Sequence, residues 1–296
     1  MKIAVIGLGE VGSHYARGLA AGGAYVSAYN RNMDDPARRE RYKALERDGV
    51  KLCSTVEEAA RESALILAVT TSRTSLDTVR SVLPYLTAGQ IYVECNSTVP
   101  DIKEEIAGML SETADMVDAT TMASVNQLGH KTPVNLSGSR AAEVSEILNG
   151  YGMNTRCIGD KVGQASALKV LRSIFMKGFE AVLVESMQAS NRYGVAEQVF
   201  DSIIDFFGTK PLPDIMRMLI ATDAIHAKRR AEEMTAITEM LRRHKIESTM
   251  SQACVKKLMW VDSLGMEQRF NGAAPADIKP VLDILSAGCC NEEQGD

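Results

Sequence analysis

"KIAVIGLGEVGSHYARGLAAGGAYVSAYNR", residues 2–31, has the pattern of a strand, a glycine-rich turn, a helix and a second strand. Residues 3–6 form a short apolar run that predicts a strand, and residues 11–19 have the apolar spacing of a helix. Gly7, Gly9 and Gly12 lie between them in a G-x-G-x-x-G arrangement. In this position the first glycine makes a tight turn, the second lets a pyrophosphate approach the backbone, and the third permits close helix–strand packing. The pattern predicts a dinucleotide site.

The whole turn is expected to contact the dinucleotide, because the N-terminus of the following helix presents unpaired backbone N–H groups to phosphates. The predicted cofactor-binding residues of this segment are Gly7, Leu8, Gly9, Glu10, Val11 and Gly12.

The second strand, residues 24–29, ends at Asn30 and Arg31. Roughly 20 residues after the glycines an acidic residue usually holds a ribose hydroxyl, and none stands here. We expect Arg31 to pair with a 2′-phosphate or to stack on adenine, and Asn30 to donate its amide to the same phosphate. NADP is therefore favoured over NAD. The alternative is a surface arginine in a turn, with Arg38, Arg39 and Arg41 either assisting or solvating a helix.

The composition is that of a globular protein with two domains. The chain has 296 residues, of which 45% are hydrophobic and 24% charged, and the formal net charge is −5. The charge gives no support for a nucleic-acid partner, and no apolar run approaches membrane-spanning length. The six cysteines lack C-x-x-C spacing and are scattered apart from the vicinal pair at 289 and 290, which is typical of reduced thiols. The N-terminus has the pattern of a strand rather than of a signal peptide. We expect a cytoplasmic protein with no membrane partner, nucleic-acid partner or metal site.

Strand and helix signals alternate to about residue 160, which predicts a doubly wound α/β sheet of the Rossmann type. Residues 65–69 and 90–95 are buried-strand runs, and residues 116–119, 134–137 and 155–158 are further candidates. Ligands bind outside the carboxyl ends of such strands. The expected cofactor contacts there are Val69, Thr70, Thr71, Thr74, Asn96 and Thr98.

After Gly159 no convincing strand pattern is found, and helical periodicities continue to the end. We therefore expect an NAD(P)-binding Rossmann domain at residues 1–160 and an all-helical substrate and dimerisation domain at residues 161–296. Residues 163–192 predict one helix about 45 Å long. Its many apolar positions predict that much of its surface is buried, and we expect a homodimer that pairs through this domain.

A polar stripe on this helix has two interpretations. Lys169, Arg172, Ser173, Lys177 and Glu180 fall within one broad sector at about 100° per residue. They are either the solvated face of an amphipathic helix or part of a site, because the helix directly follows the cofactor domain. A lysine beside Arg172 in a partly dry site would have a depressed pKa and suit acid–base chemistry.

The order of these motifs resembles the β-hydroxyacid dehydrogenases, the relatives of 3-hydroxyisobutyrate and 6-phosphogluconate dehydrogenases. The resemblance covers nearly the whole chain and is closest to a bacterial branch whose helical C-terminal domain has no assigned function. It is carried by the glycine turn, by Asn96-Ser97-Thr98, Asp118-Ala119 and Gly163-x-x-x-x-x-Lys169, and by the segments 131–138, 165–181 and 226–234.

This resemblance implies that Lys169 is the catalytic acid–base and that Ser97 and Thr98 lie beside the nicotinamide and substrate. Two positions depart from the family pattern: Met122 stands where the family has a serine, and Ser173 replaces an asparagine. A typical 3-hydroxyisobutyrate or 6-phosphogluconate substrate is therefore not expected. The predicted substrate-binding residues are Met122, Arg172, Ser173, His226 and Arg229. His226 and Arg229, together with Arg230, either supply anion contacts or belong to a solvated helix face.

The function that follows is an NADP-dependent oxidoreductase that transfers hydride between the nicotinamide and a small carbonyl or hydroxy acid. Two alternatives remain at this point. Imine reductases have a similar two-domain fold but commonly carry another proton donor in place of the lysine, and a non-catalytic NADP-binding protein would need neither Lys169 nor Ser97.

Overall fold

The computed structural model describes residues 1–33 and 35–289. The chain divides into two compact units, Met1–Ile174 and the part from Phe175 onward. The division falls inside helix α8 (Gln164–Tyr193), later than the domain boundary expected near residue 160. Backbone N–H groups of the first turn of α8 hydrogen-bond to Ser137 and Asp118, so the start of this helix belongs to the first unit.

The described residues of the first unit form one sheet of eight strands in the order β3-β2-β1-β4-β5-β6-β7-β8. All neighbouring pairs are parallel except β6 and β7, which are antiparallel. This is the doubly wound sheet that the sequence predicts. The strands are β1 (Lys2–Ile6), β2 (Tyr25–Tyr29), β3 (Lys51–Leu52), β4 (Leu65–Ala68), β5 (Ile91–Glu94), β6 (Asp115–Thr121), β7 (Val134–Ser137) and β8 (Thr155–Gly159).

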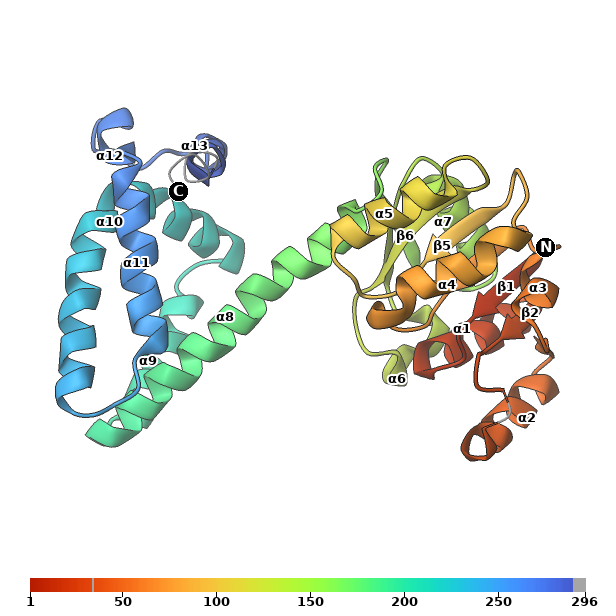
Figure 1. The fold of residues 1–296 in the computed structure, drawn as a ribbon. Helices are drawn as coiled ribbons and strands as arrows, with labels where there is room; N and C mark the ends of the chain where they lie inside the picture. The colour runs from red at the N-terminus through yellow and green to blue at the C-terminus, as the bar shows by residue number, and fades with distance from the viewer. Residues whose placement is uncertain (34, 290–296) are drawn as a thin grey trace. The chain divides into compact units, whose positions relative to one another are not determined.

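Helices cover both faces of this sheet (Figure 1), because buried side chains alternate along the central strands. Ile3 and Val5 of β1 pack with α1, α2 and α7, whereas Ala4 and Ile6 pack with α3, α4 and α5. The α-helices of this unit before α8 are α1 (Glu10–Ala21), α2 (Arg39–Arg47), α3 (Val56–Ala60), α4 (Ser75–Val82), α5 (Pro100–Leu110), α6 (Val125–Leu128) and α7 (Ala141–Gly150), with 3₁₀ turns at Pro36–Arg38, Ser72–Thr74, Leu83–Tyr85 and Gly129–Lys131.

Two strands differ from the sequence prediction. The strand β3 has only two residues and no apolar pattern of its own, and it forms because it pairs with Ser27 and Ala28 of β2. The strand β6 extends beyond the predicted 116–119, since Thr120 and Thr121 pair with Asn135 and Val134 of β7. The longer β6 puts the carbonyl group of Thr121 at the carboxyl end of the sheet.

The described part of the second unit, residues 175–289, contains only helices. Besides the rest of α8 these are α9 (Ala196–Gly208), α10 (Leu212–Arg243), α11 (Thr249–Ser263), α12 (Met266–Arg269) and α13 (Lys279–Cys289). The helices α10 and α11 lie side by side (Figure 1), and the core of the unit joins Ala224 and Ile225 of α10 to Val261 of α11 and Val281 of α13.

Long stretches of α8 expose apolar side chains. Leu171, Ile174 and Phe175 are 61%, 70% and 53% exposed, and Phe179 is 41% exposed. The expectation that much of this helix is buried is therefore wrong within a single chain. A hydrophobic surface of this kind is typical of a protein–protein contact.

The described residues add three further findings. None of their helices is both long and apolar enough to span a membrane. They contain no group of three or more His, Cys, Asp or Glu side chains that could hold a metal ion. Cys53, Cys95, Cys157 and Cys254 are free thiols, and the side chains of the vicinal pair at 289 and 290 lie outside the described part.

The glycine turn depends on Gly12 for its packing, which gives a test of the fold. A Cβ at Gly12 would lie 1.9 Å from the carbonyl oxygen of Gly7, whereas one at Gly9 meets nothing within 4 Å. We predict that Gly12→Ala lowers the free energy of unfolding by about 1–3 kcal/mol or more, because the overlap forces α1 away from β1. Gly9→Ala, at φ −69°, is the control and should leave stability nearly unchanged. Equal urea midpoints for the two variants would contradict this packing.

Candidate functional site

A cavity of about 430 Å³ opens beyond the carboxyl ends of β1, β2 and β4. Predicted cofactor residues from three separate segments line it: Gly7, Gly9, Asn30, Arg31, Val69, Thr70, Thr71 and Thr74. The other predicted residues do not line this cavity. Leu8, Glu10, Val11 and Gly12 belong to the turn and the start of α1, and Asn96 and Thr98 follow β5.

The turn after β1 has the geometry that a pyrophosphate needs. Gly7 has a φ of +101°, and a Cβ there would lie 2.4 Å from the carbonyl oxygen of Val69. Gly9 is the N-cap of α1 and has open space where a side chain would stand. No side chain caps α1, so the N–H groups of its first turn are free for an anion. These residues fit a dinucleotide.

Asn30 contributes to this cavity in a different way from the one expected. Its Oδ1 accepts a hydrogen bond from the N–H of Leu8 at 3.2 Å, and its Nδ2 donates to the hydroxyl of Tyr42 at 2.9 Å. This amide therefore braces the glycine turn against α2. Its Nδ2 carries a second hydrogen that neither bond uses, and the contact of Asn30 with a 2′-phosphate stays a prediction.

Arg31 lines the cavity and is exposed, and within the described residues no ion pair or hydrogen bond engages its guanidinium. Arg38 also lines the cavity, but its Nε pairs with Asp35 at 3.1 Å. Arg41 is exposed on α2. Arg31 thus lines the cavity without an ion pair among the described side chains, and its charge is available to an anion there.

Lys169 reaches back from α8 to the carboxyl ends of β5 and β6. Its Nζ donates to the Oγ of Ser97 at 2.9 Å and to the carbonyl oxygen of Thr121 at 2.7 Å. Partial burial, above all, holds the pKa of this ammonium below its usual value, and the charges of Arg172 and Lys103 lower it further. The depressed pKa agrees with the sequence prediction of a lysine in a partly dry site.

Buried side chains from the sheet cap the N-terminus of α8 and so place Lys169. The carboxylate of Asp118 accepts the N–H of Ser166 at 2.8 Å, and the hydroxyl of Ser137 accepts the N–H of Ala165 at 2.9 Å. These bonds satisfy two N–H groups that have no partner within the helix. Lys169 follows Ser166 by one turn and lies on the same face.

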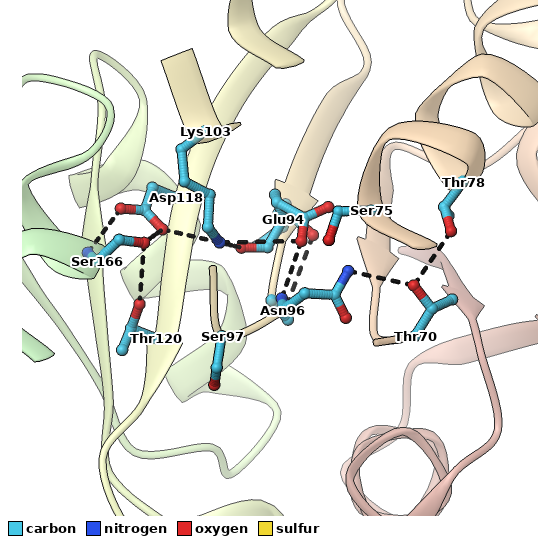
Figure 2. Close-up of polar contacts among 12 residues, drawn as sticks. Thr70, Ser75, Thr78, Glu94, Asn96, Ser97, Lys103, Asp118, Thr120 and Ser166 are labelled. Carbon is cyan, nitrogen blue, oxygen red and sulfur yellow. Dashed lines mark hydrogen bonds and ion pairs between the residues drawn. The ribbon is translucent and has the colours of Figure 1, made fainter. Parts of the chain in front are cut away.

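A chain of polar contacts connects this cap to the nucleotide cavity (Figure 2). The Thr70 hydroxyl contacts Thr78 and accepts a hydrogen bond from Asn96, and the N–H of Asn96 donates to Glu94 at 2.9 Å. The Nζ of Lys103 donates to the carbonyl oxygen of Glu94 at 2.7 Å. The same Nζ lies 3.0 Å from Asp118.

Thr98 supplies a second observation that fits a bound cofactor. Its side chain is buried, and among the described residues its Oγ1 is a buried side-chain polar atom without a hydrogen-bond partner. Buried hydroxyl groups are nearly always hydrogen-bonded. A carboxamide such as that of nicotinamide would satisfy this group.

The predicted substrate residues on α8 and directly after β6 differ in the contacts that they make. Arg172 is exposed and donates to the carbonyl oxygen of Met122 at 3.3 Å, so these two residues lie beside Lys169. The Ser173 hydroxyl instead donates to the carbonyl of Lys169 on its own helix at 2.9 Å. It therefore does not replace the family's asparagine as a free donor.

The other predicted substrate residues, His226 and Arg229, belong to α10 of the second unit. Both are exposed, and Arg229 pairs with Glu233 while Arg230 pairs with Asp223. These pairs are typical of a solvated helix face. A contact of either predicted residue with a substrate stays a prediction.

The sequence alone does not predict Glu94, Lys103 or Ser166 as part of the site. For two of them it nevertheless indicates a buried charged side chain. Glu94 is a charged residue at the end of an apolar strand run that is covered on both faces. Lys103 shares the spacing i, i+3, i+7 with Ile106 and Leu110, so it stands on the buried face of α5. Ser166 carries no such signal, because its contact with Asp118 joins residues distant in sequence.

The fold and cavity are those of a Rossmann dinucleotide-binding domain. Residues 2–159 match the family of the NAD binding domain of 6-phosphogluconate dehydrogenase, and the chain belongs to that family, whose members are nicotinamide-dinucleotide oxidoreductases. Residues 190–261 match a domain of unknown function.

An uncharacterized 28.5 kDa protein from Methanothermus fervidus is 27% identical over 87% of this chain and 97% of its own. A solved protein of unknown function, described as structurally similar to 3-hydroxyacid dehydrogenases, is also 27% identical, with a TM-score of 0.63 over 93% of this chain and 100% of its own.

Two imine reductase structures from Myxococcus stipitatus share the fold. One is in complex with NADP⁺ and is 20% identical, with a TM-score of 0.69 over 96% of this chain and 100% of its own. The other, the V8 variant in complex with NAD⁺, is 18% identical, with a TM-score of 0.75 over 96% of this chain and 99% of its own. The chain is thus related in fold to both 3-hydroxyacid dehydrogenases and imine reductases.

Proposed function

We propose that this protein is an NADP-dependent oxidoreductase that interconverts a small carbonyl compound and its alcohol, with Lys169 as the acid–base. The observation that carries the proposal is the position of the Lys169 ammonium between Ser97 and Thr121, at the edge of the sheet where the cofactor cavity opens.

The ammonium of Lys169 is arranged to deliver one proton. Of its three hydrogens, two are used in the bonds to Ser97 and to the Thr121 carbonyl, and the third is left for a substrate oxygen. A lowered pKa makes this proton easier to transfer near neutral pH. When bound, the nicotinamide supplies or accepts the hydride. In the oxidation direction the neutral amine of Lys169 takes the hydroxyl proton.

The substrate is proposed to be an acid. Arg172 is exposed, and its single bond to the Met122 carbonyl leaves most of its five N–H donors for a carboxylate. Met122 cannot offer the hydroxyl of the family's serine, so the acid is expected to differ from 3-hydroxyisobutyrate and 6-phosphogluconate. His226 and Arg229 are proposed as further anion contacts.

Imine reduction is the competing activity, and a non-catalytic NADP-binding protein is a third possibility. The fold shared with imine reductases does not distinguish them. Lys169 favours carbonyl chemistry, since an ammonium aligned by two acceptors suits protonation of an oxygen. Screening hydroxy acids, aldehydes and cyclic imines for NADPH turnover separates these activities.

The proposal includes a cytoplasmic homodimer. The free thiols support a reducing compartment. The exposed side chains of Ile174, Phe175 and Phe179 form an apolar surface on α8 that a second copy would cover. We propose no nucleic-acid or membrane partner.

Removal of Arg31 tests the cofactor. Arg31→Ala should weaken NADPH binding by on the order of 1–3 kcal/mol and leave NADH binding nearly unchanged, because a charge-assisted contact to the 2′-phosphate is lost. Arg41→Ala is the matched control on the neighbouring helix. Titration calorimetry with both cofactors makes the measurement, and equal losses for NADPH and NADH would refute the assignment.

Replacement of Lys169 tests the mechanism. Lys169→Met keeps the length of the side chain and removes its proton, so turnover should fall by about 10²–10⁴-fold. NADPH affinity should hardly change, because the dinucleotide is bound at the glycine turn. Arginine should not restore activity, since its proton is held too tightly. Near-parental turnover of Lys169→Met would exclude Lys169 as the acid–base. It would not bear on the proposed cofactor site.

Light scattering tests the homodimer. At micromolar concentration the protein should have twice the mass of one chain, and Phe175→Glu should shift it toward the monomer because a charge is placed in the apolar surface. Leu128→Glu is the control, since Leu128 is a comparably exposed apolar side chain on α6 of the first unit. A monomeric parent protein argues against the proposal.

A further inference from the structure

We propose that Lys103 is a positioning residue for Lys169, acting through Asp118 and the first turn of α8. The inference rests on the proposed function, in which Lys169 transfers the proton. Lys103 itself lies beneath the site and has no exposed surface, so it touches neither substrate nor cofactor.

Lys103 is one member of a fully buried cluster of charges. Its Nζ lies 3.0 Å from Oδ1 of Asp118 and 3.8 Å from Oε1 of Glu94, and all three side chains are 0% exposed. The same Nζ donates to the main-chain carbonyl of Glu94 at 2.7 Å. A buried carboxylate without such a partner is strongly destabilised, so removal of Lys103 would leave Asp118 without its buried counter-charge.

The charge of Asp118 is used at the start of α8. Its Oδ2 accepts the N–H of Ser166, and its Oδ1 accepts the Ser166 hydroxyl, each at 2.8 Å (Figure 2). A carboxylate is also favoured there because the N-terminus of a helix carries partial positive charge. Since Lys169 stands one turn further on, the Lys103–Asp118 pair fixes both the position and the rotation of the helix segment that carries it.

Lys103 also acts on Lys169 through its charge. The charges that act on Lys169 are Arg172 on α8 and Lys103 on α5, and Lys103 is in turn paired with the carboxylates of Glu94 and Asp118. Burial lowers the pKa of Lys169 most, followed by Arg172 and Lys103. Loss of Lys103 leaves Asp118 uncompensated and therefore raises the pKa of Lys169, whereas loss of the Asp118 charge leaves Lys103 uncompensated and lowers it.

These opposite directions give a test that needs no substrate. The rate at which acetic anhydride acetylates Lys169 is followed by mass spectrometry as a function of pH, because only the neutral amine reacts. In Lys103→Met the midpoint should move to higher pH, because one of the charges that lower the pKa of Lys169 is removed. In Asp118→Asn it should move to lower pH. Lys43→Met, which removes an exposed lysine of α2, is the control and should leave the midpoint unchanged.

Activity gives the second readout. In Lys103→Met the alkaline limb of the turnover profile for carbonyl reduction should move in the same direction as the labelling midpoint, and kcat should fall about tenfold as the helix turn loses its anchor. The Kd for NADPH should change less than kcat, since Lys103 reaches the cavity only through Glu94, Asn96 and Thr70.

The outcomes separate this inference from the proposed function. An unchanged labelling midpoint in folded Lys103→Met, or shifts of the same sign in Lys103→Met and Asp118→Asn, overturns the positioning role. If Lys103→Met does not fold, the direction of the shift in Asp118→Asn decides. If the labelling midpoints move as expected but Lys169→Met keeps full turnover, the result supports the coupling between Lys103 and Lys169. The same result excludes the proposed role of Lys169 in catalysis.

Discussion

The hydrogen bond from the Ser166 N–H to the carboxylate of Asp118 is the contact on which the site depends. It joins the central part of the sheet to the first turn of α8, and it satisfies a backbone donor that no helical carbonyl can reach. Because β6 supplies both Asp118 and the Thr121 carbonyl, a single strand sets the position of α8 and also receives the ammonium of Lys169. The Lys103 ammonium makes this buried carboxylate tolerable.

The carboxyl ends of β1, β2, β4 and β5 provide the other half of the site. There the cavity, the uncapped start of α1 and the unpartnered hydroxyl of Thr98 are all suited to a dinucleotide. Polar contacts run from Thr70 through Asn96 and Glu94 to Lys103. The side chains that line the cavity and those that place the lysine therefore belong to one connected network within the first unit.

Local signals in the sequence predicted the doubly wound sheet and the glycine turn, because each depends on residues close in the chain. The catalytic role of Lys169 is implied by the family resemblance and stays a prediction. Contacts between distant residues were not predictable in this way. Nothing near Asn30 indicates that its amide is engaged by Leu8 and Tyr42. The two-residue β3 likewise exists only through its pairing with β2. Phe175 on α8 is exposed in the single chain. The apolar pattern of a helix therefore does not indicate which part of the molecule, or which partner, covers it.

A crystal structure of the protein grown with NADPH would locate the nicotinamide relative to Lys169 without knowledge of the substrate. We expect the pyrophosphate at the N-terminus of α1, the 2′-phosphate at Arg31, and the carboxamide within hydrogen-bond distance of the Thr98 Oγ1. The reacting face of the ring should then be next to Ser97 and the Nζ of Lys169. A nicotinamide ring bound away from Lys169, with that lysine still held by Ser97 and Thr121, would contradict this expectation.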